Sequence, residues 1–110
     1  MFTVENGKIT VTRGDTGIIS LDLTLPDGTP YEFLEGDSLT LSVKKNVRDT
    51  DYVLQKTSSR PAIIFEHEDT DDIDPGNYIY DIEFRHGLGQ VSTIGPDKFI
   101  VKYDVTRGDV

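Results

Sequence analysis

The stretch SLTLSVK, residues 38–44, alternates apolar and polar side chains at successive positions. Leu39, Leu41 and Val43 therefore point to one side of an extended chain, while Thr40 and Ser42 point to the other. This two-residue period predicts a β-strand with one buried face and one face in water, as the strands of antiparallel sheets commonly have.

The same period recurs along the chain, with turn residues between the runs. Three further clear runs and four weaker ones bring the prediction to about eight strands, at residues 19–25, 78–84, 99–105, 8–12, 52–56, 62–67 and 90–94. The composition agrees, because Ile, Val and Thr number 10, 9 and 12 whereas Ala and Met occur once each. Residues 86–89 are predicted to connect two of these strands as a hairpin. We therefore expect an all-β protein.

Eight short strands with one apolar face each must pack as two sheets or close into a barrel. Residues 69–80 favour two sheets, because a helical turn or tight corner there, plugged by Ile73, leads into a strand that begins near Tyr78. In immunoglobulin-like sandwiches a tyrosine after such a corner buries its ring and bonds its hydroxyl to backbone upstream. Tyr78 is thus the candidate structural tyrosine corner, and the alternative is a core aromatic without that bond. We predict one immunoglobulin-like antiparallel β-sandwich domain of about 7–8 strands over residues 1–110.

Charge and composition exclude several classes of function. With 11 Lys and Arg against 20 Asp and Glu, the formal charge is −9, which opposes binding to nucleic acid and to anionic membrane surfaces. Cysteine is absent, so disulfides and thiolate metal sites are excluded. We expect no cofactor, no membrane span and no export signal in residues 1–12.

The most conspicuous polar feature is an acidic run between residues 66 and 74. It places six carboxylates within nine residues: Glu66, Glu68, Asp69, Asp71, Asp72 and Asp74. A calcium site is one interpretation, but Ile73 stands where an EF-hand loop needs a ligand, and no closing glutamate follows. A solvated loop is the preferred interpretation. Asp71, Asp72 and Asp74 are nevertheless candidate interaction residues for a basic surface on another protein.

Other motifs point away from catalysis. Arg-Gly-Asp occurs twice, at 13–15 and 107–109, each time after Val-Thr, and we interpret it as turn chemistry rather than as a cell-adhesion signal. His67 and His86 are interpreted as surface histidines. No nucleophile elbow, phosphate loop or paired catalytic carboxylates can be identified, so we do not expect an enzyme.

Tyr31 and Phe33 are the remaining candidate interaction residues. They follow the Pro-Asp-Gly turn and lie outside the predicted strands. Two interpretations are open for them. The rings cap one end of the sandwich, or they are exposed and form an interface patch.

From the acidic run onward the motifs are more specific: Asp69-Thr70, Ile73, Pro75-Gly76, Tyr78, Tyr80-Asp81-Ile82, Gly89, Val91, Thr93-Ile94, Phe99, Val101 and Val105-Thr106. With Arg13-Gly14-Asp15 and the strand at 38–44, this pattern resembles small immunoglobulin-like modules of bacteriophages and prophages, in particular the N-terminal domain of baseplate upper proteins. The resemblance covers nearly the whole chain. It implies a virion building block, assembled in the host cytoplasm, that attaches a fibre or receptor-binding protein, and it carries over no catalytic residue.

Two hypotheses of function follow. The first is a noncatalytic module of a phage tail or baseplate that contacts other virion proteins, and further copies of itself in a homo-oligomer, through sheet edges and end loops. The second is a carbohydrate-binding or cell-surface adhesion module that uses exposed aromatic rings. Loss of glycan binding on Tyr31→Ala would favour the second.

Overall fold

The computed structural model describes residues 2–21, 27–87, 89 and 91–104. In those residues the chain forms eight strands and one short helix: β1 (Phe2–Glu5), β2 (Lys8–Thr12), β3 (Gly17–Ser20), β4 (Ser38–Lys44), β5 (Leu54–Ser58), β6 (Ala62–Phe65), α1 (His67–Asp71), β7 (Gly76–Arg85) and β8 (Val91–Lys102). No helix in this described part of the chain is long and apolar enough to cross a membrane. The protein is all-β, as the alternation predicted.

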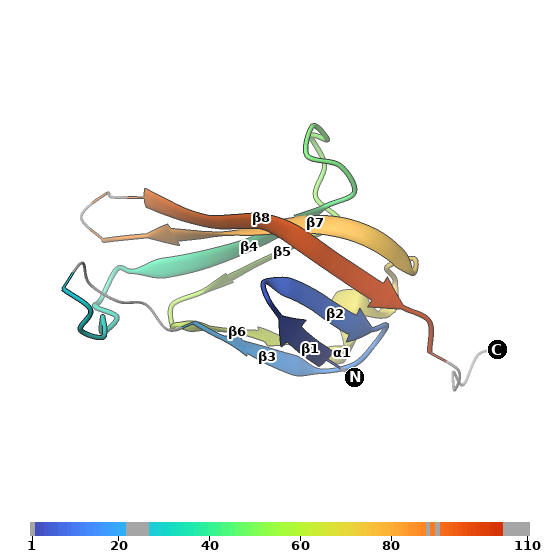
Figure 1. Ribbon diagram of the computed structural model, residues 1–110, viewed down its shortest axis with the longest axis horizontal. Helices are drawn as coiled ribbons and strands as arrows, with labels where there is room; N and C mark the ends of the chain where they lie inside the picture. Colours follow the sequence, from blue (N-terminus) through green and yellow to red (C-terminus); the bar gives the residue numbers. More distant parts are fainter. Residues whose placement is uncertain (1, 22–26, 88, 90, 105–110) are drawn as a thin grey trace.

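The strands form two sheets that lie one above the other (Figure 1). Six strands make the larger sheet in the order β1-β2-β8-β7-β4-β5, and β3 pairs with β6 in the smaller one. Among the described strands, every pair is antiparallel except β2 with β8, which run parallel. The prediction of a wholly antiparallel sandwich is therefore wrong at this pair. Alternation reports which face of a strand is buried and carries no information about its direction.

The inner faces of the two sheets share one hydrophobic core. Leu39, Leu41 and Val43 of β4 are completely buried, as their alternation predicted. The other core residues that lie on strands also fall on alternate positions: Ile9, Val11, Ile19, Ile63, Phe65, Tyr78, Tyr80, Ile82, Phe84, Phe99 and Val101. The smaller sheet therefore packs on the inner face of the larger one.

Strand β8 joins two segments that the sequence predicted as separate strands, at 90–94 and 99–105. It stays paired with β7 through a bulge, in which Gly95 and Pro96 together lie opposite the single residue Asp81. Gly95 has φ +100°, and a side chain there would approach the carbonyl oxygen of Tyr80 at 3.2 Å. Glycine therefore lets the strand continue where most residues would end it.

The remaining differences concern the ends of elements. Strand β1 was not predicted, and β5 begins at Leu54 rather than at residue 52. The run at 19–25 corresponds to β3, which begins earlier and ends at Ser20, and residues 22–26 lie outside the described residues. Strand β6 ends at Phe65, two residues before the predicted end, because α1 begins at His67.

The corner before β7 has a helical turn, one of the two forms that the sequence left open, and α1 begins at His67, two residues before the predicted corner. The backbone N–H of Glu66 donates to Oδ2 of Asp69 at 2.7 Å, which caps the first turn of α1. Ile73 is buried beneath the turn, with 7% of its surface exposed. The hydroxyl of Tyr78 donates to the carbonyl oxygen of Asp74, four residues upstream, at 2.5 Å. This is the contact that a tyrosine corner requires.

Candidate functional site

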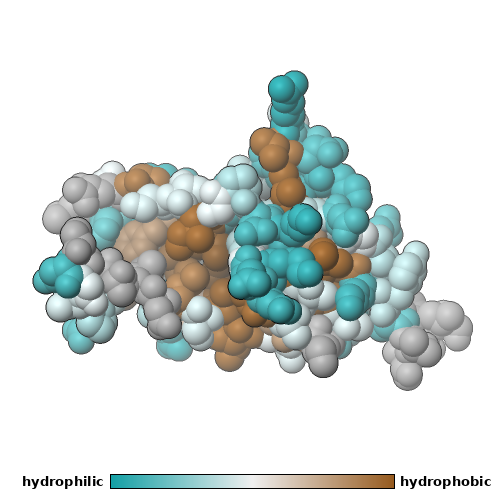
Figure 2. Space-filling model, viewed as in Figure 1, coloured by the Kyte–Doolittle hydropathy of each residue, from teal (hydrophilic) through white to brown (hydrophobic). Residues whose placement is uncertain are grey.

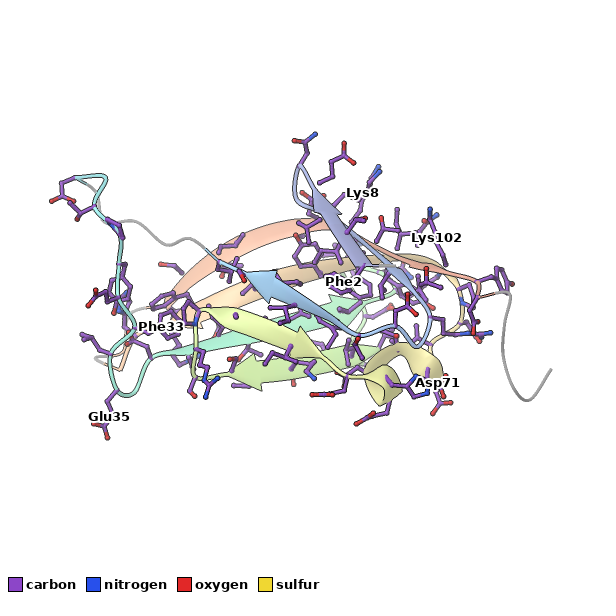
Figure 3. The ribbon with its side chains drawn as sticks, turned by 90° about the horizontal axis from the view of Figure 1, so that it is seen from below. Phe2, Lys8, Phe33, Glu35, Asp71 and Lys102 are labelled. Carbon is purple, nitrogen blue, oxygen red and sulfur yellow. The ribbon has the colours of Figure 1, made fainter. Side chains whose placement is uncertain are left out.

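Tyr31 and Phe33 lie at one end of the sandwich, and both are half-buried. Their ring centroids are 5.5 Å and 5.2 Å from that of Phe84, a core residue of β7. Figure 3 shows Phe33 beside the end of the sheets, while Glu35 of the same loop points away from the molecule. The two rings therefore cover the end of the core, which is one of the two arrangements that the sequence left open.

Asp37 ties this loop to the hairpin between β7 and β8. Its side chain is 3% exposed and accepts hydrogen bonds from the Tyr31 hydroxyl at 2.5 Å and from the backbone N–H groups of Leu34 and Gly87 at 3.0 Å. Because the Tyr31 proton goes to Asp37, Nδ1 of His86 must donate to the Tyr31 oxygen, at 3.2 Å. The bond from Tyr31, followed by the two backbone bonds, lowers the pKa of Asp37, and the same carboxylate raises the pKa of Tyr31. Asp37 is thus a buried, ionised residue that joins the loop at 31–37 to the hairpin after β7, a role that the sequence did not predict.

The acidic run, residues 66–74, forms the corner at the other end of the molecule, and we call it the acidic corner. Asp71 lies on α1, with its Oδ1 3.6 Å from Nε2 of His67. Asp72 and Asp74 follow the helix and are exposed. In the described part of the chain, no group of three or more His, Asp and Glu side chains is arranged to hold a metal ion. The corner is therefore a polar surface in which Asp71 is engaged within the molecule.

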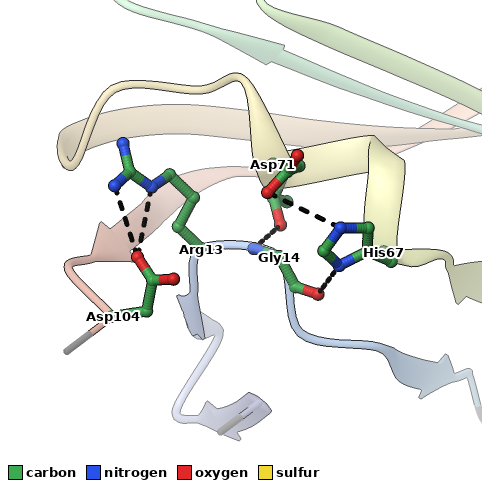
Figure 4. A network of polar contacts seen from close by, with 6 residues as sticks. Arg13, Gly14, His67, Asp71 and Asp104 are labelled. Atoms are coloured by element: carbon green, nitrogen blue, oxygen red, sulfur yellow. Dashed lines mark hydrogen bonds and ion pairs between the residues drawn. The ribbon is translucent and has the colours of Figure 1, made fainter. Parts of the chain in front are cut away.

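The first Arg-Gly-Asp motif is held by contacts within the protein (Figure 4). Nη2 of Arg13 lies 3.3 Å from Oδ1 of Asp104, and the N–H of Gly14 donates to the buried Thr70 hydroxyl at 2.8 Å. The Gly14 carbonyl can only accept, so Nδ1 of His67 carries the proton of their 2.8 Å bond. Gly14 has φ +83°, as expected for a glycine turn. The motif joins the end of β2 to α1, and its second copy, at 107–109, lies outside the described residues.

A feature that the sequence did not predict lies on the outer face of the larger sheet, the face turned away from β3 and β6. The connection at residues 45–53, green in Figure 1, rises from the sheet and borders a hollow of about 400 Å³. Its lining includes Thr40, Ser42, Val47, Tyr52, Gln55, Ile79, Asp81 and Glu83. Tyr52 is half exposed, and Nζ of Lys44 lies 5.0 Å from the centre of its ring. Figure 2 shows apolar as well as polar residues on the projecting connection.

A second hollow of about 380 Å³ adjoins the first, and both include Ile79. We call it the lysine hollow, because its lining comprises Lys8, Lys45, Lys98, Asn77, Tyr78, Ile79 and Ile100. Ile79 pairs across the sheet with Lys44 of β4 on one side and with Lys98 of β8 on the other. The outer face therefore has an apolar centre between two lysines, in a chain whose acidic residues outnumber its basic ones.

This arrangement suits binding to another macromolecule better than chemistry on a small substrate. Isoleucines at the centre of a shallow surface and charged groups around them match the apolar core and polar rim of protein interfaces. In the predicted strand at 78–84, alternation places Ile79 on the water-facing side, opposite to Tyr78 and Tyr80. An isoleucine at a water-facing position was therefore the one signal of this surface in the sequence.

No family model, curated protein or solved structure matches this chain.

Proposed function

We propose that this protein is a noncatalytic assembly module of a phage or prophage particle, in its tail or baseplate. It acts by protein–protein contacts and enters the virion during assembly in the host cytoplasm. The observation that carries the proposal is the outer face, where two hollows meet at the half-buried Ile79 and charged side chains surround it. A surface of this composition gains free energy when a partner covers its apolar centre.

We also propose that the fold is immunoglobulin-like. Two packed sheets over one core support this assignment, as does the bond from the Tyr78 hydroxyl to the Asp74 carbonyl at the corner before β7. The assignment to a phage particle is supported by the resemblance of the motifs between Asp69 and Val101 to baseplate modules.

The edges of the larger sheet supply a second kind of contact. Strands β1 and β5 are its outermost strands, so each has backbone N–H and C=O groups on one side that no strand of this sheet pairs. An extended segment of a neighbouring virion protein can add to such an edge. Side-chain contacts on the outer face would then select the correct neighbour.

The test is incorporation into particles. We expect Ile79→Lys to lower the amount of the chain in purified particles by at least about tenfold, because a third lysine beside Lys44 and Lys98 removes the apolar centre and adds repulsion. Mass spectrometry of particles purified from the producing host measures this ratio. The matched control is Ile64→Lys, on the smaller sheet, where 47% of the side-chain surface is already exposed.

Both variants should keep the far-ultraviolet spectrum and thermal unfolding of the parent chain. Absence of the parent chain from particles, or equal incorporation of both variants, would contradict the proposal. So would saturable binding of the chain to a glycan that is lost on Tyr52→Ala. Such binding would instead support the carbohydrate-binding alternative, for which Tyr52 offers the exposed ring that Tyr31 does not.

A further inference from the structure

Charges of opposite sign are separated on this molecule. The lysine hollow has three lysines and no carboxylate in its lining. The acidic corner has six carboxylates within nine residues. The two surfaces adjoin the same segment of the chain, since Asn77 and Tyr78 of β7 line the hollow and Asp74 of the acidic corner lies just before β7. One chain thus offers two local surfaces that complement each other.

The lysines of the hollow are available to a partner. Within the described residues, no ion pair joins Lys8, Lys45 or Lys98 to a carboxylate. Lys45 is held in place, since its Nζ donates to the Asn77 carbonyl at 3.2 Å and lies 4.7 Å from the centre of the Tyr78 ring. The hollow therefore presents one positioned lysine, Lys45, and two further exposed lysines around the apolar Ile79 and Ile100.

The acidic corner divides into inner and outer carboxylates. Asp69 is used within the molecule, because it caps α1 and its Oδ2 lies 2.5 Å from Nζ of Lys56. Asp72 and Asp74 are exposed, and the backbone at Asp74 is fixed by the hydroxyl of Tyr78. These two carboxylates are presented on a rigid turn, so their binding sacrifices little backbone freedom.

We propose that the lysine hollow of one copy binds the acidic corner of a second copy, with Asp72 and Asp74 facing Lys8 and Lys98. The inference deepens the proposed function by naming a partner of the outer face, and it rests on that function only for its biological purpose. A second copy is the occupant favoured by charge, because this chain itself carries two exposed carboxylates, Asp72 and Asp74, whose charge complements a lysine-lined hollow.

The salt dependence of this contact follows from the net charge of −9. Two copies repel each other over long distances, and this repulsion is reduced when the Debye length falls to about 10 Å at 0.1 M salt. Contacts between the two patches persist there, and they weaken at 1 M salt, where the Debye length is about 3 Å. We therefore expect self-association near 0.1 M salt that is lost at 1 M.

The experiment uses two double variants with reversed charge. The first is Lys8→Glu with Lys98→Glu, which reverses the hollow, and the second is Asp72→Lys with Asp74→Lys, which reverses the corner. The control is Glu32→Lys with Glu35→Lys, since both residues are exposed in the loop at the opposite end of the molecule. Sedimentation equilibrium over a range of concentrations gives the dissociation constant of each sample.

The parent chain and the control should associate, whereas each double variant alone should have a dissociation constant at least about tenfold higher. An equimolar mixture of the two double variants should associate again, because the reversed hollow of the first faces the reversed corner of the second, and the unchanged hollow of the second faces the unchanged corner of the first. A monomeric parent chain, unchanged association of either variant, or a mixture that stays monomeric would overturn the inference. A monomeric parent chain that still enters particles through Ile79 would leave the proposed function standing and identify another virion protein as the occupant.

Discussion

Replacing Phe99 with alanine is expected to remove about 3–5 kcal/mol from the free energy of unfolding. Phe99 is completely buried on β8, where its ring stacks on Phe65 of the smaller sheet at 6.1 Å and meets the edge of Tyr80 at 6.4 Å. Alanine would leave a cavity at the contact between the two sheets. Since a domain of this size is stable by only about 5–15 kcal/mol, the variant should lose a large share of its stability.

Urea unfolding followed by circular dichroism measures the change. The midpoint should fall with little change in the slope, because the surface exposed on unfolding stays similar. The control is Ile64→Ala on β6, whose side chain is 47% exposed and whose replacement should change stability by less than about 1 kcal/mol. Similar midpoints for the two variants would show that the sheets do not pack around Phe99.

Replacing Asp37 with asparagine is expected to lower Tm by roughly 10 °C at pH 7. The carboxylate accepts hydrogen bonds from the Tyr31 hydroxyl and from the N–H groups of Leu34 and Gly87, using both of its oxygens. In asparagine one of these oxygens becomes an NH2 group, which donates and cannot accept, so at least one of the three bonds is lost. The loop at 31–37 would then detach more readily from the hairpin after β7. Glu35→Gln, an exposed residue of the same loop, is the matched control and should leave Tm unchanged.

The Asp37 effect has a defined pH dependence. The pKa of Asp37 is lowered in the folded protein, chiefly by the hydrogen bond from Tyr31, relative to about 3.9 in the unfolded chain. The stability that this carboxylate contributes is therefore present above the unfolded pKa and is lost as pH falls through the lower folded pKa. The Tm difference between the parent chain and Asp37→Asn should shrink below about pH 4. A difference that stays constant down to pH 2 would show that ionisation of Asp37 is not involved.

The sequence predicted much of the fold because burial follows a simple period along each strand. Leu39, Leu41 and Val43 are inside, and the helical turn and Ile73 precede β7. Partner choice is a different matter. The parallel pairing of β2 with β8 joins residues about 90 positions apart, and no local turn chemistry reports such a contact.

The site was less predictable than the fold. Ile79 becomes the centre of a surface only when β4, β7 and β8 place lysines on both sides of it, which depends on the register of three strands. Asp37 was one acidic residue among 20 in the chain, and its burial depends on two loops that meet at one end of the sandwich. Both features arise from long-range pairing, which the residue pattern of a single strand does not contain.

The central claim is that the outer face of the larger sheet is covered by another protein in the assembled particle. Acetylation of lysines, measured by mass spectrometry on the free chain and on purified particles, tests it directly. We predict that labelling of Lys8, Lys45 and Lys98 falls by at least about tenfold in the particle. Equal labelling of the three hollow lysines in both samples would contradict the account.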